Sequence, residues 1–335
     1  MNFPQEGIAK ELYARFENHF SGHMPVVSME LLGAGVHWHI MLRTSNRMAV
    51  VHCFDTEYLF QFLGENDVKA TARTKDPDMV LRSVDDWIVG HTLEILYGRY
   101  DFVDVTKRAF ARLKQQLMET APELEGVDFK YNIHDGEYFN FDLEHGDRSC
   151  SCERWRDYAR PKFSFAWEEC KLFEVEHDSI AEIALAIKAW MIDQVPPSYL
   201  ETHFPWIDIG ELARFYERGE GIKGEFLASW DKMGEFYGEW MNEYMDADKV
   251  LVLMGLLREK GYDEKLRVGQ SLSTLMLSRS RRHGLRPEQK FVAISFPEEG
   301  MVIHDLEGNE VAYGKIELVP ELFGLLDELI REEID

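Results

Sequence analysis

The feature that most constrains the fold is a stretch of sequence that occurs twice along the chain. FVDVTKRAFARL at Phe102–Leu113 aligns with WIDIGELARFYE at Trp206–Glu217, and this alignment pairs Asp104 with Asp208. Either two amphipathic helix starts resemble each other by chance, or the chain contains a partial internal duplication. A duplication predicts two similar modules, each with strands followed by helices.

The two paired aspartates have a structural explanation. An aspartate just before an amphipathic helix supplies an acceptor for the first free amides, and Glu211 completes a capping box after Asp208. Asp104 and Asp208 are therefore predicted to cap helices and not to act as catalytic acids. Trp87 also pairs with Trp190 when one residue is inserted before the second aspartate.

Alternating apolar residues predict strands in both modules. In the first module the pattern is seen in four segments, VHWHIML, MAVVHCF, EYLFQFL and DVKATART. In the second it is seen in VDFKYNI, EYFNFDL, KFSFAW and KLFEVE. Apolar residues at helical spacing follow each group, so amphipathic helices are expected after each set of strands.

The remainder of the chain is predicted to be helical and then mixed. Residues 224–260 have a helical pattern, with an apolar seam formed by Phe226, Trp230, Met233, Tyr237, Trp240 and Tyr244. A further helix is expected from Asp263 to Gly284. Three short strands, KFVAISF, MVIHD and EVAYGKIEL, and a helix at Pro320–Ile334 then predict a small β-β-β-α unit.

These patterns predict an α+β fold. It consists of antiparallel β-meander units followed by amphipathic helices, partly duplicated, with a helical insert and a small C-terminal β-β-β-α unit. The expected modules are 1–125, 126–262 and 263–335. At 335 residues and 45% hydrophobic content, the chain is large enough for several packed cores.

The charge of the chain bears on its partners and its compartment. Acidic residues outnumber basic ones by 61 to 37, which gives a net charge of −24 and repels nucleic acid and anionic membranes. No apolar run approaches the roughly 20 residues of a membrane-spanning helix. The N-terminus lacks a secretion signal, and the four cysteines are too few for a disulfide framework. We expect a cytoplasmic protein.

Motifs for catalysis, metals and cofactors are incomplete. Neither a GxGxxG loop, a P-loop nor GxSxG occurs. His37, His39 and His52 lie in strand patterns, and Cys150-Ser151-Cys152 provides one CxC where zinc sites usually need two knuckles. Cross-strand histidines and a loop with free thiols explain these residues without a metal. No metal, cofactor or catalytic residue is predicted.

One basic cluster stands out in this acidic chain. Arg279, Arg281, Arg282, His283 and Arg286 follow one another closely. Arginines in such a cluster bind phosphate or a nucleotide, or they pair with acids of the same protein near a helix end. The second interpretation is favoured.

The most informative charge pattern is an acidic ridge along the expected long helix. Asp231, Glu235, Glu239 and Glu243 are spaced by four, and like charges at this spacing slightly destabilise an isolated helix. The ridge is either a solvated face that keeps the protein in solution or a docking surface for a basic partner. In the second case Trp230, Trp240 or Phe236 would supply an aromatic anchor.

Taken together, the sequence favours a non-enzymatic, acidic protein-binding protein. The proposed class is a bacterial immunity or antitoxin-type protein that neutralises a basic toxin or nuclease, with Asp231, Glu235, Phe236, Glu239, Trp240 and Glu243 as the partner-binding residues. One alternative is an enzyme for a nucleotide or phosphorylated metabolite that uses Arg279, Arg281, Arg282 and Arg286. Another is a subunit of a phage-defence or other multiprotein assembly.

Overall fold

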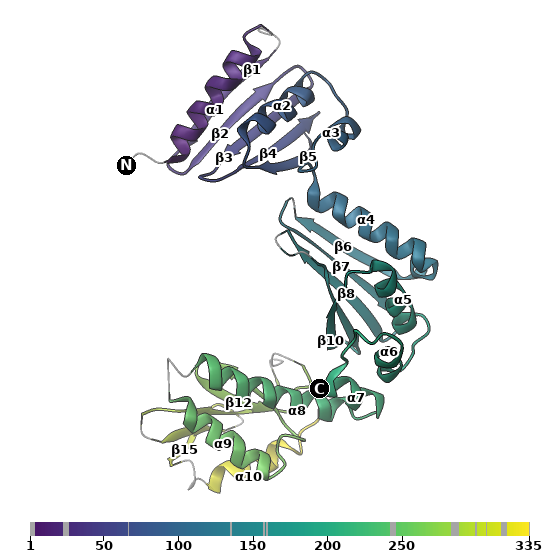
Figure 1. Ribbon diagram of the computed structural model, residues 1–335. Coiled ribbons are helices and arrows are strands. Elements are labelled where there is room, and N and C mark those ends of the chain that lie inside the picture. Colours follow the sequence, from purple (N-terminus) through teal and green to yellow (C-terminus); the bar gives the residue numbers. More distant parts are fainter. Residues whose placement is uncertain are drawn as a thin grey trace. The chain divides into compact units, whose positions relative to one another are not determined.

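The computed structural model contains three antiparallel five-stranded sheets (Figure 1). It describes residues 4–22, 27–65, 67–134, 136–156, 158, 160–241, 246–282, 288–298, 300–305, 307–315 and 320–334. In each sheet, consecutive strands are hydrogen-bonded neighbours. The fold is therefore α+β and built from β-meanders, as predicted.

The first sheet is covered on one face by helices. Its strands are β1 (Ser28–Ala34), β2 (His37–Arg43), β3 (Arg47–Cys53), β4 (Tyr58–Gly64) and β5 (Asp67–Thr74). Its helices are α1 (Pro4–Phe20), α2 (Pro77–Ile88) and α3 (Leu93–Arg99). Buried side chains from α1, α2 and alternate positions of β2–β5 form one core, and Figure 1 shows both helices on the same side of the sheet.

The second sheet follows the same plan. It is preceded by α4 (Val105–Thr120) and the short 3₁₀ helix η1 (Pro122–Gly126). Its strands are β6 (Asp128–His134), β7 (Tyr138–His145), β8 (Arg148–Trp155), β9 (Lys162–Trp167) and β10 (Cys170–Glu176). It is followed by α5 (Ile180–Met191) and α6 (Pro197–His203). Phe110 of α4 contacts Phe139 of β7, and Trp190 of α5 contacts Phe165 of β9, so aromatic rings hold these helices on the sheet.

Along the chain, the third sheet is also preceded and followed by helices. Before it come α7 (Gly210–Glu217), α8 (Gly221–Glu235), the π-helical turn η2 (Phe236–Trp240) and α9 (Ala247–Glu259). The strands are β11 (Arg267–Ser271), β12 (Thr274–Ser278), β13 (Phe291–Ser295), β14 (Met301–His304) and β15 (Glu310–Gly314). The last helix, α10 (Pro320–Leu329), packs with α9 and the sheet in a common core.

The first two sheets share an arginine–tryptophan contact with the same pattern of hydrogen bonds. The guanidinium of Arg47, at the start of β3, lies 4.1 Å from the ring centroid of Trp87 in α2. It donates to the carbonyls of Trp87 (2.8 Å) and His91 (2.5 Å). The indole N–H of Trp87 donates a hydrogen bond to the carbonyl of Met48 (3.0 Å). This contact fixes the helix against the strand through stacking and three hydrogen bonds.

The second copy is formed by Arg148 and Trp190. The guanidinium of Arg148, at the start of β8, lies 3.8 Å from the Trp190 ring. It donates to the carbonyls of Trp190 (3.3 Å) and Val195 (2.7 Å), and the Trp190 indole donates to the carbonyl of Ser149 (3.2 Å). The sequence pairing of Trp87 with Trp190 therefore corresponds to equivalent positions in the fold.

Several local predictions were wrong. The segment from Asp263 to Gly284 holds β11 and β12 where a helix was predicted, so the C-terminal unit has five strands and not three. Cys150 and Cys152 are buried in β8 and are not in a loop. Asp104 precedes α4, but its side chain makes no capping bond to that helix. Asp208 does accept a bond from the amide of Gly210, at 3.1 Å.

The chain divides into two compact units. One comprises residues 1–144, 151–163 and 176–188, and the other comprises 145–150, 164–175 and 189–335. The module boundaries near 125 and 262 stay a prediction. Within the described ranges, no helix combines the length and the hydrophobicity needed to cross a membrane.

Candidate functional site

The predicted partner-binding residues lie at the end of α8 and in η2. The inner side of this segment is anchored by Trp230 and Tyr237, which are fully buried. The Trp230 indole donates to the carbonyl of Leu266 at 2.8 Å, which ties α8 to the chain just before β11. Burial of two large aromatic side chains therefore fixes which side of the segment faces solvent.

The π-helical turn changes the direction of Trp240. The predicted apolar seam placed Trp240 on the buried side, but its side chain is 70% exposed. A π-helical turn contains more residues than an α-helical turn, so side chains after Tyr237 are rotated away from the seam. Phe236 stays half-buried and packs against the core of the third sheet. Trp240 is thus a large aromatic side chain in solvent.

The acidic residues of the ridge differ in whether they form ion pairs. Asp231 forms an ion pair with Arg258 of α9. Glu235 and Glu239 are exposed, and no basic side chain among the described residues pairs with either. Glu243 lies outside the described residues. Two unpaired carboxylates and an exposed indole therefore remain at this surface, which we call the Trp240 surface (Glu235, Phe236, Glu239 and Trp240).

The predicted phosphate-binding arginines are engaged within the protein. Glu225 of α8 is 4% exposed and accepts bonds from Arg281 (2.8 Å) and Arg282 (2.7 Å). The hydroxyl of Tyr216 also donates to Glu225, and Arg281 pairs with Glu168. Burial and the bond to Glu225 raise the pKa of the Tyr216 hydroxyl. Arg281 and Arg282 therefore form a partly exposed network around the buried Glu225, in which each of the two arginines has an acidic partner.

The other two arginines of that cluster can be placed only in part. Arg279 donates to the carbonyls of Glu332 (3.1 Å) and Lys265 (2.8 Å). Arg286 lies outside the described residues. Arg281 and Arg282 thus pair with acids of the same protein, whereas Arg279 bonds to backbone carbonyls, and the element before them is strand β12 where a helix end was expected.

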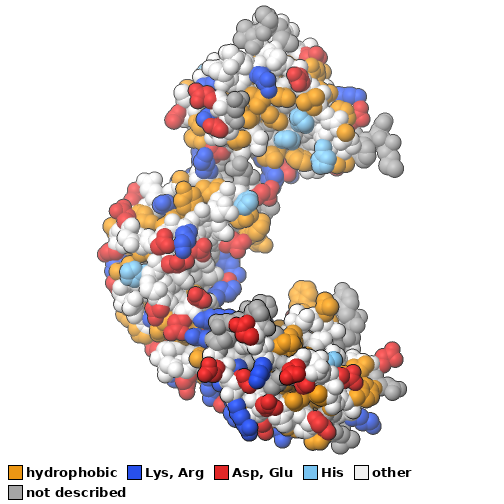
Figure 2. Space-filling model, turned by 180° about the vertical axis from the view of Figure 1, so that it is seen from behind, with side chains coloured by type: hydrophobic (Ala, Val, Ile, Leu, Met, Phe, Trp, Pro, Cys, Tyr) orange, Lys and Arg blue, Asp and Glu red, His pale blue; other side chains and the backbone are white. Residues whose placement is uncertain are grey.

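A surface that the sequence analysis missed is the uncovered face of the first sheet. The side chains that alternate with the buried ones on β1–β4 include Leu32, Met41, Val50, His52, Leu59 and Leu63. Figure 2, seen from behind, shows histidines among hydrophobic side chains on the part that holds this sheet. The available signal was that the positions between the buried ones on β3 and β4 include Met48, Val50, Leu59 and Leu63, whereas a strand with one solvated face usually has polar residues there.

His39 and His52 lie next to each other on this face. They are register partners on β2 and β3, and their ring centroids are 5.4 Å apart. Burial, and then the neighbouring His39, lower the pKa of His52, so the imidazole is held neutral. Among the described residues, no three His, Cys, Asp or Glu side chains are grouped so that they could hold a metal ion.

Burial shifts the pKa of two of the four thiols away from nucleophilic reactivity. Burial raises the pKa of Cys53 to about 12. Burial is also the largest cause of the raised pKa of Cys170, with Glu225 adding to it. A nucleophilic cysteine needs the opposite shift, since the thiolate is the reactive form.

Comparisons with known proteins provide no relative. No protein-family model matches the chain, and neither a curated protein nor a solved structure matches it.

Proposed function

We propose that this chain is a non-enzymatic protein-binding protein whose partner is a basic protein. The observation that carries the proposal is Trp240, 70% exposed beside Glu235 and Glu239, for which the described part of the chain supplies no ion-pair partner. Immunity and antitoxin-type proteins that neutralise a basic toxin or nuclease are the class that fits these features. The net charge of −24 also favours a basic partner.

In the Trp240 surface, the tryptophan would provide affinity and the carboxylates would raise the association rate. Tryptophan is enriched among the side chains that dominate binding energy, because it buries a large area at low entropic cost. Carboxylates around it attract a basic partner before contact and so raise the association rate. Glu235 and Glu239 serve this purpose without giving up an internal partner. Asp231 would first have to leave Arg258, so we expect it to contribute less.

The alternative functions receive less support from the geometry. A phosphate bound by Arg281 and Arg282 would have to displace Glu225, which is 4% exposed and bonded to both. Separating such a pair leaves a buried charge without a partner and is strongly unfavourable. The nucleotide enzyme and the assembly subunit remain alternative proposals.

The test is capture of the partner from the native host, followed by binding kinetics with surface variants. We expect a basic protein to be captured by the wild type. The double variant E235K/E239K should slow association by about tenfold or more at low salt and flatten its salt dependence. W240A should mainly speed dissociation and weaken binding by about 2 kcal/mol or more.

A matched control keeps the change in net charge the same. Glu259 and Glu333 are also exposed, so E259K/E333K reverses two charges elsewhere in the same unit. This control should keep the steep salt dependence and the slow dissociation. If E235K/E239K and E259K/E333K associate equally fast, or if W240A binds like the wild type, the Trp240 surface is not the binding site.

A further inference from the structure

A pocket opens beside β5, at the end of the uncovered face of the first sheet. Its volume is about 250 Å³, and all of its lining residues belong to the compact unit that contains residues 1–144. One water needs about 10–15 Å³, and a cavity of about 150 Å³ holds benzene. The pocket is therefore large enough for a small organic molecule. The lining includes Leu59, Phe102, Val105, Arg73, Lys75 and Arg156.

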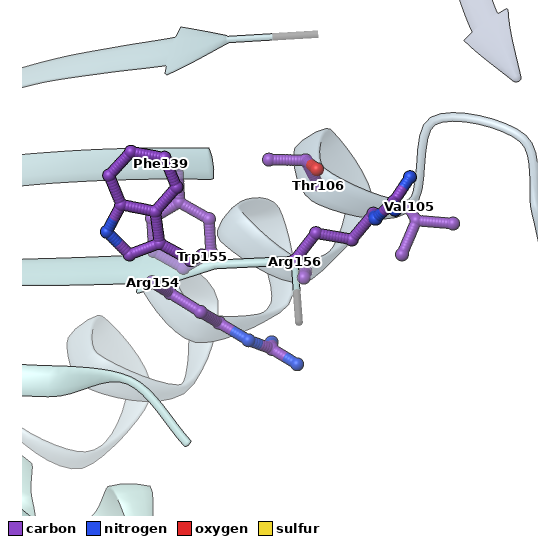
Figure 3. Close-up of a pocket in the computed structure, with 7 residues that line it drawn as sticks. Val105, Thr106, Phe139, Arg154, Trp155 and Arg156 are labelled. Atoms are coloured by element: carbon purple, nitrogen blue, oxygen red, sulfur yellow. The ribbon is translucent and has the colours of Figure 1, made fainter. Parts of the chain in front are cut away.

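Apolar side chains form one side of the pocket. Leu59 lies on the uncovered face of β4, and residues 102–105 are held next to β5, where the Asp104 amide donates to a carbonyl of that strand (2.8 Å). Figure 3 shows the Arg156 side chain extending from the end of β8 toward Val105 at the start of α4. Val105 is 42% exposed although it is apolar. A ligand with an apolar body would remove this surface from water, which is favourable.

The charged groups of the pocket are mainly basic. Three basic side chains, Arg73, Lys75 and Arg156, line it together with one acidic side chain, Glu57. Arg73 donates to Glu137 (2.8 Å) and lies 3.4 Å from Glu57, and Arg156 lies 3.8 Å from Glu57. Lys75 is exposed, and no acidic side chain of the described chain forms an ion pair with it. Positive charge is thus in excess in the lining of a pocket whose chain is strongly acidic as a whole.

Arg73 has a donor without an acceptor. Its side chain is 18% exposed, and its Nε atom is buried without a hydrogen-bond partner in the described part of the chain. Native proteins leave few buried polar atoms unpaired. Nε and a terminal nitrogen of a guanidinium together form the planar fork that holds a carboxylate through two parallel hydrogen bonds. A carboxylate bound at Arg73 would supply the missing acceptor.

We propose that this pocket binds a small organic monocarboxylate. Its carboxylate would accept from Arg73 and Arg156, and its apolar body would lie against Val105 and the neighbouring Leu59. The site is separate from the Trp240 surface and does not depend on the proposed function.

Glu57 favours a single negative charge on the ligand. Its carboxylate oxygens lie near both guanidinium groups, so Glu57 offsets part of their positive charge. A phosphate dianion would bring two negative charges close to this carboxylate, and like charges at short range repel. A monocarboxylate brings only one.

The experiment is calorimetric titration of the full chain with benzoate, benzamide, acetate and inorganic phosphate. Benzoate has both the charge and the ring, benzamide has nearly the same shape without the charge, and acetate lacks the ring. We expect benzoate to bind at millimolar concentrations or below, and each of the other three probes to bind about tenfold more weakly or worse. Benzamide or acetate that binds as tightly as benzoate, or phosphate that binds more tightly, would overturn the proposal.

Two variants locate the binding site. V105E places a carboxylate on the apolar side of the pocket and should weaken benzoate binding about tenfold or more, because like charges repel. An acidic residue is favourable in the first turn of a helix, so α4 should remain folded in V105E. R156Q removes one guanidinium and should weaken benzoate binding about fivefold or more.

V89E is the matched control for V105E. Val89 is 56% exposed, belongs to the same compact unit and does not line the pocket. V89E adds the same charge elsewhere and should change the affinity for benzoate by less than about twofold. The proposal is overturned if benzoate does not bind to the wild type at millimolar concentrations. It is also overturned if V105E and R156Q, folded as judged by circular dichroism, bind benzoate like the wild type.

Discussion

The first and second sheets have equivalent covered faces, but their uncovered faces differ in chemistry. Arg47 and Arg148 are the first residues of equivalent strands. Val51 and Cys152 each lie four residues after the arginine, and both are buried. The residues between the buried positions face away from the helices. On β3 they are Met48, Val50 and His52, and on β8 they are Ser149, Ser151 and Glu153.

The neighbouring strands show the same difference. Phe60 and Phe163 are both fully buried at matching places of β4 and β9. The residues just before them are Leu59 in the first sheet and Lys162 in the second. The arrangement of helices restricts only the covered face, since packing permits few substitutions there. On the uncovered face of the first sheet, apolar side chains such as Val50 and Leu59 lie among polar ones such as Glu30 and Gln61. Exposed apolar area of this kind is typical of a surface that contacts another molecule.

The largest expected effect comes from breaking what the two sheets share. Trp87 is 4% exposed and Trp190 is fully buried. An arginine stacks on each indole ring, and each indole N–H donates a hydrogen bond to a backbone carbonyl. We expect W87A and W190A each to lower the free energy of unfolding by about 3–5 kcal/mol, because the cavity and the lost contacts add. Urea unfolding followed by far-ultraviolet circular dichroism measures both changes.

W240A is the control for this comparison. Trp240 is 70% exposed, so its removal should change the free energy of unfolding by less than about 0.5 kcal/mol. Similar losses for W87A and W190A would support structural equivalence of the two contacts. A loss below about 1 kcal/mol for either would mean that the arginine–tryptophan contact does not hold that helix in place.

The prediction of the fold from the sequence succeeded where packing leaves a pattern. β2–β5 have buried apolar residues at alternate positions, and each strand was predicted. β8 was missed because its sequence RSCSCERW contains small polar residues, although Cys150 and Cys152 are buried. The sequence predicts a helix over β11 and β12 because the apolar residues there are too few to distinguish a helical period from a strand period. The five-stranded plan of the third sheet has no local sequence marker.

The geometry of the candidate sites could also be predicted only in part from the sequence. The exposure of Trp240 depends on a π-helical turn, which spacing by three and four residues cannot reveal. The pairing of Asp231 with Arg258 joins two helices and leaves no local signature. Asp104 was predicted to cap α4 from its position alone. Its left-handed backbone and its bond to the amide of Thr71 depend on β5, which lies far away in sequence.

A smaller effect should distinguish the two uncovered faces. Val50 and Ser151 occupy matching places, and glutamate introduced at either is solvated. V50E should reduce the fluorescence of a bound hydrophobic dye such as bis-ANS, because it interrupts the apolar surface, while S151E should not. Both should change the free energy of unfolding by about 1 kcal/mol or less. Equal dye binding by V50E and the wild type would mean that the uncovered face of the first sheet is not an accessible apolar surface.

The smallest effect is a pH dependence confined to the first sheet. Burial and His39 lower the pKa of His52 below its ordinary value of 6.5. The unfolded chain therefore binds a proton at a higher pH than the folded chain, so the stability contributed by neutral His52 is lost as the pH falls below about 6.5. H52Q should flatten the dependence of the unfolding free energy on pH between about 7.5 and 5.5. S151A in the second sheet removes no titratable group and should leave the slope as in the wild type. An unchanged slope in H52Q would show that His52 is as easily protonated in the folded protein as in the unfolded chain, and the two sheets would then not differ in this respect.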